Sequence, residues 1–187
     1  MKRTFIAFQI QAGDKILECA GRLKEILQEE SIKWVDPDRL HGTLAFLGDT
    51  TEDRIPAVGG ILEKYVPAYP SPGVQIRGMG VFRSMKDPRV IWLGMAPMPS
   101  LAELKGKIDR ELGPMGFQAG DRPFRPHLTL GRIKRLKNRD LLSGLLQEYR
   151  DHFFQEGSIS ELVFYESILR PEGPVYHPLL KVPFGEE

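Results

Sequence analysis

Cysteine is almost absent from this sequence, which holds one, Cys19, among 187 residues. An internal disulfide framework is therefore excluded, and a chain of this length can bury a core large enough to fold without one. The single thiol also indicates a reducing compartment. Cys19 falls in an expected amphipathic helix, where it is best interpreted as a small buried apolar residue, so we give it no catalytic role.

Long apolar runs are also missing. The apolar stretch Phe5 to Phe8, which follows Lys2 and Arg3, is too short for the core of a signal peptide. No other run is long enough to span a bilayer. We therefore expect a cytoplasmic protein without a membrane partner.

The chain lacks an excess of charge of either sign. Its 26 basic and 25 acidic residues leave a formal charge of +1, which argues against a protein that coats long stretches of nucleic acid. A local anion site remains open, because the segment from Arg122 to Arg139 is basic and has no acidic residue. Its seven basic residues are Arg122, Arg125, Arg132, Lys134, Arg135, Lys137 and Arg139. Charge alone does not separate an anion site from a solvated surface turn.

Strands and helices are expected to interleave along the chain. The predicted strands are 4–10, 40–47, 74–82, 89–95, 127–133, 159–169 and 176–182. The predicted helices are one from Asp14 with apolar positions Leu17, Ala20, Leu23 and Leu27, and others over 52–66, 100–112 and 139–150. Asp14 should cap the first helix, and Ser100 with Glu103 forms a capping-box pattern. The mixed order favours an α+β fold over a doubly wound parallel sheet.

An internal repeat runs through the sequence. The motif HGTL at 41–44 recurs as HLTL at 127–130, and the same offset of 86 superposes the first strand and first helix on later ones. Two halves with one element order can pack about a pseudo-twofold axis, which would bring both histidines to a central cleft. We therefore expect residues 1–187 to form a single domain of two intertwined, repeat-like lobes.

Side-chain alternation gives each motif a polar face. In an extended strand His41 and Thr43 share one side, while Gly42 and Leu44 share the other. The second motif, 127–130, repeats this arrangement with His127 and Thr129. The alternative is that each histidine is a structural residue at a strand start.

Two histidines suit chemistry at phosphorus. An imidazole has an ordinary pKa near 6.5, so at neutral pH one ring can accept a proton while the other, held positive beside a phosphate, donates one. In-line attack requires the two rings on opposite sides of phosphorus. Thr43 and Thr129 can donate hydrogen bonds to the non-bridging oxygens.

Two arginines are candidate phosphate ligands. Arg125 lies two residues before His127 and should point into the same cleft, although it could instead be a surface arginine paired with Asp121. Arg132 has the opposite parity to His127, so it reaches the cleft only from a bulge or from the strand end, where it could stack on a base. We expect no metal and no other cofactor, because neither motif has a second ligand at the usual spacing.

Several stretches together carry a resemblance to a known family. They are Arg3 to Phe8, Trp34-Val35, HGTLAFLG at 41–48, RVIWLG at 89–94, FRPHLTLGR at 124–132, and Glu166-Ser167 with a later Tyr176. With these stretches the chain resembles the two-histidine (2H) phosphoesterases, and within them the RNA 2′,3′-cyclic phosphodiesterases once described as 2′–5′ RNA ligases. One departure is Gly42, which stands where a branched apolar residue is common.

The resemblance implies a bilobed α+β fold and metal-independent hydrolysis of a 2′,3′-cyclic phosphate to a 2′-phosphate. It implies that His41 donates a proton to the leaving 3′-oxygen, that His127 activates water, and that Arg132 is the family's arginine after the second motif. The expected partners are RNA 3′ ends or nucleotides that carry a 2′,3′-cyclic phosphate, bound by a monomer. Two alternatives stay open: ligation or hydrolysis of 2′–5′ linkages, and an RNA-end binding module without turnover.

Overall fold

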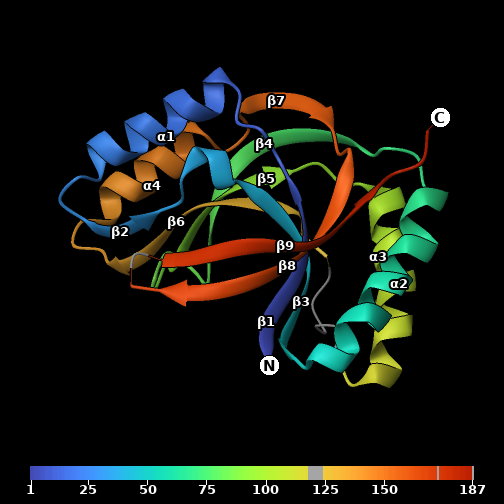
Figure 1. The fold of residues 1–187 in the computed structure, drawn as a ribbon. Coiled ribbons are helices and arrows are strands. Elements are labelled where there is room, and N and C mark those ends of the chain that lie inside the picture. Colours follow the sequence, from blue (N-terminus) through green and yellow to red (C-terminus); the bar gives the residue numbers. More distant parts are fainter. Residues whose placement is uncertain (118–123, 172, 187) are drawn as a thin grey trace.

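The computed structural model describes residues 1–117, 124–171 and 173–186. Over these residues the chain forms one nine-stranded antiparallel sheet and four α-helices, which confirms the α+β class (Figure 1). The strands are β1 (Lys2–Gln9), β2 (Ser31–Trp34), β3 (His41–Thr50), β4 (Gly73–Phe82), β5 (Val90–Met95), β6 (His127–Arg135), β7 (Phe153–Ser158), β8 (Glu161–Arg170) and β9 (Gly173–Pro183). The helices are α1 (Asp14–Ile26), α2 (Ile55–Tyr65), α3 (Pro99–Leu112) and α4 (Arg139–Glu148).

The order of the strands is symmetric about the sheet centre. It reads β7-β4-β5-β6-β3-β1-β8-β9, with β2 paired to β6 on a branch. Moving outward from the central β3–β6 contact, β1 matches β5, β8 matches β4, and β9 matches β7. The two central strands meet at the Gly42–Leu128 pair, inside the two histidine motifs. The expected pseudo-twofold relation between two halves is therefore confirmed.

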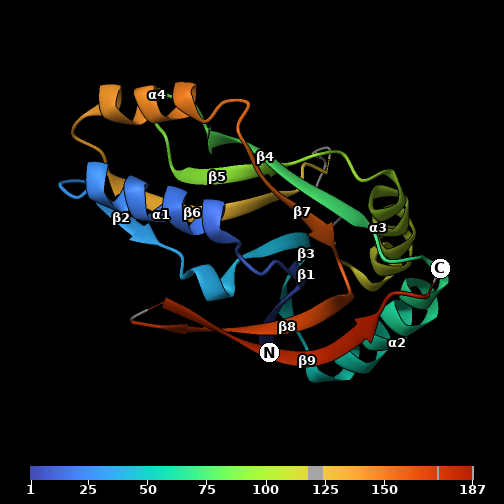
Figure 2. The ribbon, with the colours of Figure 1, turned by 90° about the horizontal axis from the view of Figure 1, so that it is seen from above.

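Each half gives a strand and a helix to the other. Strand β4 from the first half pairs with β5, and β8 from the second half pairs with β1. Helix α1 lies beside α4, where Arg22 pairs with Glu148, and α2 lies beside α3, where the Tyr65 hydroxyl donates to Glu111. The two helix pairs sit at different ends of the sheet (Figures 1 and 2). Each half therefore pairs one of its strands with a strand of the other half.

The sheet has a core face and a groove face. One apolar cluster contains buried residues of all four helices together with Leu44 and Leu128, so the helices cover the face opposite the two histidines. On β1, Ile6 and Phe8 join this cluster, while Phe5 joins a separate cluster on the other face. Burial on both faces explains why β1 reads as a continuous apolar run.

Two predicted helix caps are wrong. Helix α1 is capped at Gly13, whose N–H donates to the Gln155 side chain from β7 at 2.7 Å, and Asp14 is its first residue. Helix α3 begins at Pro99, so Ser100 lies inside it and forms no cap. The Glu103 carboxylate accepts a hydrogen bond from Tyr69 instead. In both cases a tertiary contact replaces the local one.

Other local predictions change in detail. Leu17, expected on the apolar stripe of α1, is 43% exposed, and its neighbour Ile16 is buried in its place. Pro56 stands in the first turn of α2, where a proline is tolerated. Short strands β2 and β7 were not predicted, nor was the cap of α4 by the Asn138 side chain. Among the described residues no helix is long and apolar enough to cross a membrane.

The departure at Gly42 has a packing explanation. A Cβ atom built on Gly42 would lie 2.2 Å from Cζ of Phe8, which is fully buried. The phenyl ring of Phe8 therefore fills the space that a branched side chain at position 42 would need. The strand keeps its rigidity because a neighbour on β1 supplies the missing volume.

We expect Gly42→Val to destabilise the protein by about 1–3 kcal/mol, because it overpacks the core against Phe8. Adding Phe8→Ile should recover most of this loss, since it removes the clashing ring atoms. Denaturant unfolding of both single variants and the double variant measures the coupling. Gly157→Ala on β7, where a Cβ atom meets nothing within 4 Å, is the matched control. Additive effects at positions 8 and 42 would contradict this explanation.

We propose that the 187 residues unfold as one unit, because the halves exchange β4 and β8 and cannot separate without losing sheet pairs on both sides. Tryptophan fluorescence from Trp34 and Trp92, which report on β2 and β5, should change at the same denaturant concentration as far-UV circular dichroism. Two separated transitions would show that the lobes are independent.

Candidate active site

Both motif histidines lie where β3 and β6 begin, next to the strand pair at the sheet centre. His41 and Thr43 are half-buried while Gly42 and Leu44 are buried, and β6 repeats this alternation over 127–130. The predicted polar face of each motif is therefore present. Because β3 and β6 run antiparallel through Gly42 and Leu128, the two polar faces adjoin.

The same hydrogen bond orients both imidazoles. Nδ1 of His41 lies 2.9 Å from the carbonyl oxygen of Arg39, and Nδ1 of His127 lies 2.8 Å from the carbonyl oxygen of Arg125. A carbonyl oxygen only accepts, so each Nδ1 carries the hydrogen and donates it. Nε2 is then the atom of each ring that gains or loses a proton in the groove.

Aromatic side chains hold each ring in place. The His41 ring lies 5.2 Å from Tyr176 in an edge-to-face arrangement and 5.6 Å from Phe5. The His127 ring lies 4.6 Å from Phe82, also edge-to-face, and 6.4 Å from Trp92. Packed rings and a fixed Nδ1 bond leave each imidazole little freedom to rotate.

The electrostatic environment of His41 disfavours its charged form. Burial is the largest cause that lowers its pKa below the ordinary 6.5, and the charges of Arg132 and His127 lower it further. The hydrogen bond to the Arg39 carbonyl opposes these effects. His41, His127 and Arg132 are therefore close enough to repel one another, as one anion-binding group would.

Arg132 reaches this group through a bulge in β6. Ile91 and Trp92, adjacent on β5, face Gly131 and Thr129, so Leu130 is an extra residue in β6. The carbonyl of Leu130 accepts a hydrogen bond from the N–H of Val35. The bulge reverses the alternation of side chains along β6 and turns Arg132 to the same side as His127. A bulge is one of the two ways in which Arg132 was expected to reach the cleft.

Arg125 departs from the simple parity argument. Strand β6 begins at His127, so Arg125 precedes the strand and its exposed side chain is not placed by strand alternation. Its carbonyl oxygen, rather than its guanidinium, makes the contact with His127. Asp121, the alternative partner of Arg125, and Arg122 of the basic segment lie outside the described residues.

Arg39 is a site residue that the sequence reasoning missed. It occupies the position equivalent to Arg125, two residues before the motif histidine, and its carbonyl orients His41 in the same way. The offset of 86 relates the two arginines and could have found it. Together with Arg3 and Arg132, Arg39 lies near enough to Tyr176 to act on the pKa of its hydroxyl, which burial raises overall.

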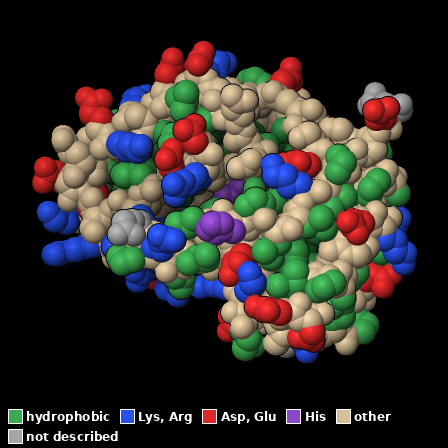
Figure 3. Space-filling model, viewed as in Figure 1, with side chains coloured by type: hydrophobic (Ala, Val, Ile, Leu, Met, Phe, Trp, Pro, Cys, Tyr) green, Lys and Arg blue, Asp and Glu red, His purple; other side chains and the backbone are tan. Residues whose placement is uncertain are grey.

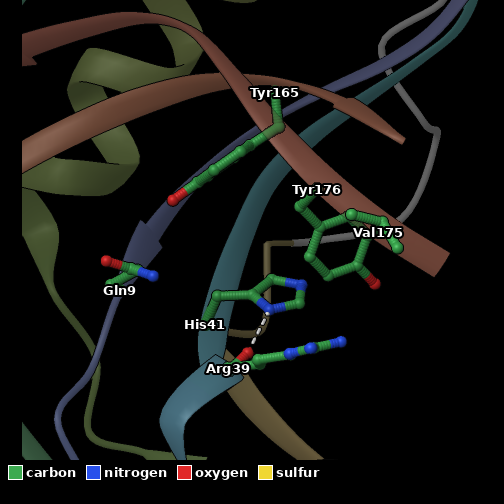
Figure 4. A pocket seen from close by; sticks show the side chains of 6 residues that line it. All are labelled: Gln9, Arg39, His41, Tyr165, Val175 and Tyr176. Carbon is green, nitrogen blue, oxygen red and sulfur yellow. Dashed lines mark hydrogen bonds between the residues drawn. The ribbon is translucent and has the colours of Figure 1, made fainter. Parts of the chain in front are cut away.

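A pocket opens on the His41 side of the groove. It has a volume of about 180 Å³, and its lining residues are Gln9, Arg39, His41, Tyr165, Val175 and Tyr176. Figure 4 shows the Arg39 side chain below the His41 ring, extending toward the same side as the Tyr176 hydroxyl. The volume is below the ~300 Å³ of small ligand sites, so this pocket suits one part of a nucleotide.

The other two histidines and the cysteine lie outside this group. His177 is exposed on β9, and His152 packs its ring 4.8 Å from Phe154 beyond α4. Cys19 is buried, which raises its pKa to about 11. No cluster of three or more His, Cys, Asp or Glu side chains that could hold a metal ion occurs within residues 1–117, 124–171 and 173–186.

A symmetric sheet that brings two His-x-Thr strands together defines a two-histidine phosphoesterase. The chain belongs to the LigT-like phosphoesterase family, whose model, described as "LigT like Phosphoesterase", matches residues 8–92 and again 93–176. The two successive matches divide the chain into the halves that the repeat indicated.

Relatives of named function align over nearly the whole chain. An RNA 2′,3′-cyclic phosphodiesterase of Methanothermobacter thermautotrophicus is 32% identical, covering 93% of this chain and 94% of the relative. One of Thermotoga maritima is also 32% identical, covering 97% and 95%. Two solved structures share the fold: TT0787 of Thermus thermophilus (TM-score 0.80, 23% identity, 99% of each chain) and Escherichia coli LigT complexed with 3′-AMP (TM-score 0.72, 23% identity, 98% of each chain).

In the free protein, we expect NMR titration to place the pKa of His41 below 6.5. Arg132→Gln should raise this pKa, because it removes a positive charge that disfavours the imidazolium. Lys24→Gln on the outer side of α1 is the matched control for loss of one cation. No response to Arg132→Gln would show that the two groups do not interact, and titration of His41 at or above its ordinary value would show that burial does not dominate its pKa.

Proposed function

We propose that this protein hydrolyses the 2′,3′-cyclic phosphate of an RNA 3′ end or of a nucleotide to a 2′-phosphate, without a metal ion. The observation that carries the proposal is the pair of imidazoles, each oriented by a carbonyl two residues upstream so that Nε2 is free to exchange protons. The names of the relatives support the choice of a cyclic phosphodiester as substrate.

The proposed reaction is an in-line displacement at phosphorus. Nε2 of His127 accepts a proton from water as the water oxygen forms its bond to phosphorus. The bond between phosphorus and the 3′-oxygen breaks on the opposite side, and Nε2 of His41 donates a proton to that oxygen. The product keeps the phosphate on the 2′-oxygen, and the two histidines exchange protonation states.

The negative charge of the substrate would favour the protonated form of His41 that the reaction needs. The low pKa of this residue in the free protein leaves it mostly neutral at pH 7, although a proton donor must be charged. A phosphodiester carries one negative charge, and an opposite charge within ~4–6 Å favours the imidazolium. Binding of the substrate therefore raises the pKa of His41 and loads the proton that the leaving oxygen needs.

The hydroxyls and the nearest guanidinium complete the anion site. Thr43 and Thr129 share a face with the histidines, and the structure records no hydrogen bond between their hydroxyls and other described residues. They are thus available to donate to the non-bridging oxygens. Arg132, turned inward by the bulge, stabilises the negative charge that develops on these oxygens.

We expect His41→Ala and His127→Ala each to lower kcat for a nucleoside 2′,3′-cyclic phosphate by roughly 10²- to 10⁴-fold, because each removes one positioned proton transfer. The assay contains a chelator, and chromatography separates the 2′-phosphate from the 3′-phosphate product. Full activity of both variants would contradict the two-histidine mechanism.

His177→Ala is the matched control, since His177 is an exposed histidine on β9 outside the group. Loss of activity on adding chelator would contradict metal independence. A 3′-phosphate product would reverse the assignment of the leaving oxygen. A parallel panel with 2′–5′-linked oligonucleotides distinguishes the ligation and linkage-hydrolysis alternatives.

A further inference from the structure

The two halves of the groove differ in charge although their backbones match. Strand β3 has its own bulge, where Ile6 and Ala7 face Ala45 and Thr43, so Leu44 is the extra residue. This is the counterpart of Leu130 in β6. After each bulge the strand turns an equivalent residue into the groove: Phe46 in β3, which is 69% exposed, and Arg132 in β6.

The difference in charge between the two strands continues beyond Phe46 and Arg132. Strand β6 continues with Lys134, which is exposed and is an extra residue opposite β2, between the Ile32–Ile133 and Ser31–Arg135 pairs, whereas β3 has Gly48 at the equivalent place. Because β3 and β6 are antiparallel, the far end of β6 and the far end of β3 lie at opposite ends of the groove. After its bulge β6 thus presents Arg132 and Lys134, whereas β3 presents Phe46 and Gly48, with Arg3 on the neighbouring strand β1.

Two more cations join the β6 end. Lys33 on β2 pairs directly with Arg132 and therefore shares its face, and its Nζ lies against Gly173 at the tip of the β8–β9 hairpin. Arg39 precedes β3. Both Arg39 and Arg132 lie near Tyr176. We call Arg39, Lys33, Arg132 and Lys134 the basic strip.

The basic strip carries an electrostatic cost in the free protein. Like charges directly opposite each other on paired strands are destabilising, and Lys33 faces Arg132 in this way. Within the described part of the chain, no carboxylate forms an ion pair with any of its four residues. A bound polyanion would relieve this repulsion.

The reaction geometry connects the basic strip to the substrate. In the proposed function, on which this inference rests, the leaving 3′-oxygen belongs to the ribose of the terminal nucleotide. That ribose therefore lies on the His41 side of phosphorus, next to the pocket with Arg39 and Tyr176. Lys33 and its partner Arg132 lie along the same hairpin, because Lys33 contacts Gly173 at the tip of the β8–β9 hairpin that carries Tyr176.

We propose that the basic strip binds the phosphates of the RNA chain upstream of the terminal nucleotide, so that the preferred ligand is an oligoribonucleotide that leaves the groove over β6 and β2. Figure 3 shows several Lys and Arg side chains at the edge of the molecule where Figure 1 places β2. At the β3 end, Phe46 and Gly48 stand where β6 has Arg132 and Lys134, so β3 itself offers no cation to a polyanion at these places.

Binding tests this proposal independently of turnover. The probe is a fluorescent pentaribonucleotide that ends in a 2′-phosphate, measured by anisotropy at several salt concentrations, with a nucleoside 2′-phosphate as competitor. We expect the pentanucleotide to bind at least tenfold more tightly than the nucleoside 2′-phosphate at low salt. For single strands, each phosphate contact contributes about −0.7 to the slope of log affinity against log salt.

Graded charge removal gives the decisive comparison. Lys134→Gln should reduce the magnitude of the slope by about 0.7, and Lys33→Gln/Lys134→Gln by about 1.4, with at least a tenfold loss of pentanucleotide affinity in the double variant. The affinity of the double variant for the nucleoside 2′-phosphate should fall by a factor severalfold smaller than its affinity for the pentanucleotide. Lys24→Gln controls for net charge, and an unchanged thermal midpoint checks folding.

The possible outcomes separate the two proposals. An unchanged salt slope in the double variant, or equal losses for both ligands, would overturn the role of the basic strip. Binding of the pentanucleotide through the strip by a protein that hydrolyses no cyclic phosphate would support the strip and refute the proposed function.

Discussion

The site depends on one hydrogen bond that occurs twice, from Nδ1 of each motif histidine to the carbonyl two residues before it. This bond fixes the tautomer, so that Nε2 alone exchanges protons with a ligand. The acceptors are backbone atoms of Arg39 and Arg125, and their positions follow from where β3 and β6 begin. The sheet therefore sets the chemistry of the imidazoles directly, without a carboxylate relay among the described side chains around them.

The exchange of strands explains why this arrangement is rigid. The central strands touch each other at one residue pair, which by itself would be a weak joint. Strand β4 pairs with β5, and β8 pairs with β1, so each lobe contains a strand of the other half. One continuous core beneath Leu44 and Leu128 then holds both motifs. Movement of one histidine relative to the other would disturb packing in both lobes.

Periodicity predicted the polar faces of both motifs, because alternation in a strand is a local rule that needs no knowledge of neighbours. The sequence predicted the inward turn of Arg132 only if β6 contained a bulge. The bulge itself could not be predicted, because the carbonyl of its extra residue Leu130 accepts a hydrogen bond from Val35, which is far away in the sequence. The capping box at Ser100 failed for a similar reason: the Tyr69 hydroxyl engages Glu103. Arg39 could have been predicted from the repeat, because it stands 86 residues before Arg125.

A repeat produces two similar histidines, whereas acid–base catalysis needs two different ones. The differences come from what surrounds them. His41 borders a pocket with Tyr176 and Arg39 and feels Arg132, while His127 packs against Phe82 and Trp92. Burial and positive charges lower the pKa of His41, and under the proposed function an anion bound beside it would offset these charges. In the proposed function Arg132 both lowers the pKa of His41 in the free protein and attracts the anion, so this one side chain would couple proton loading to substrate binding.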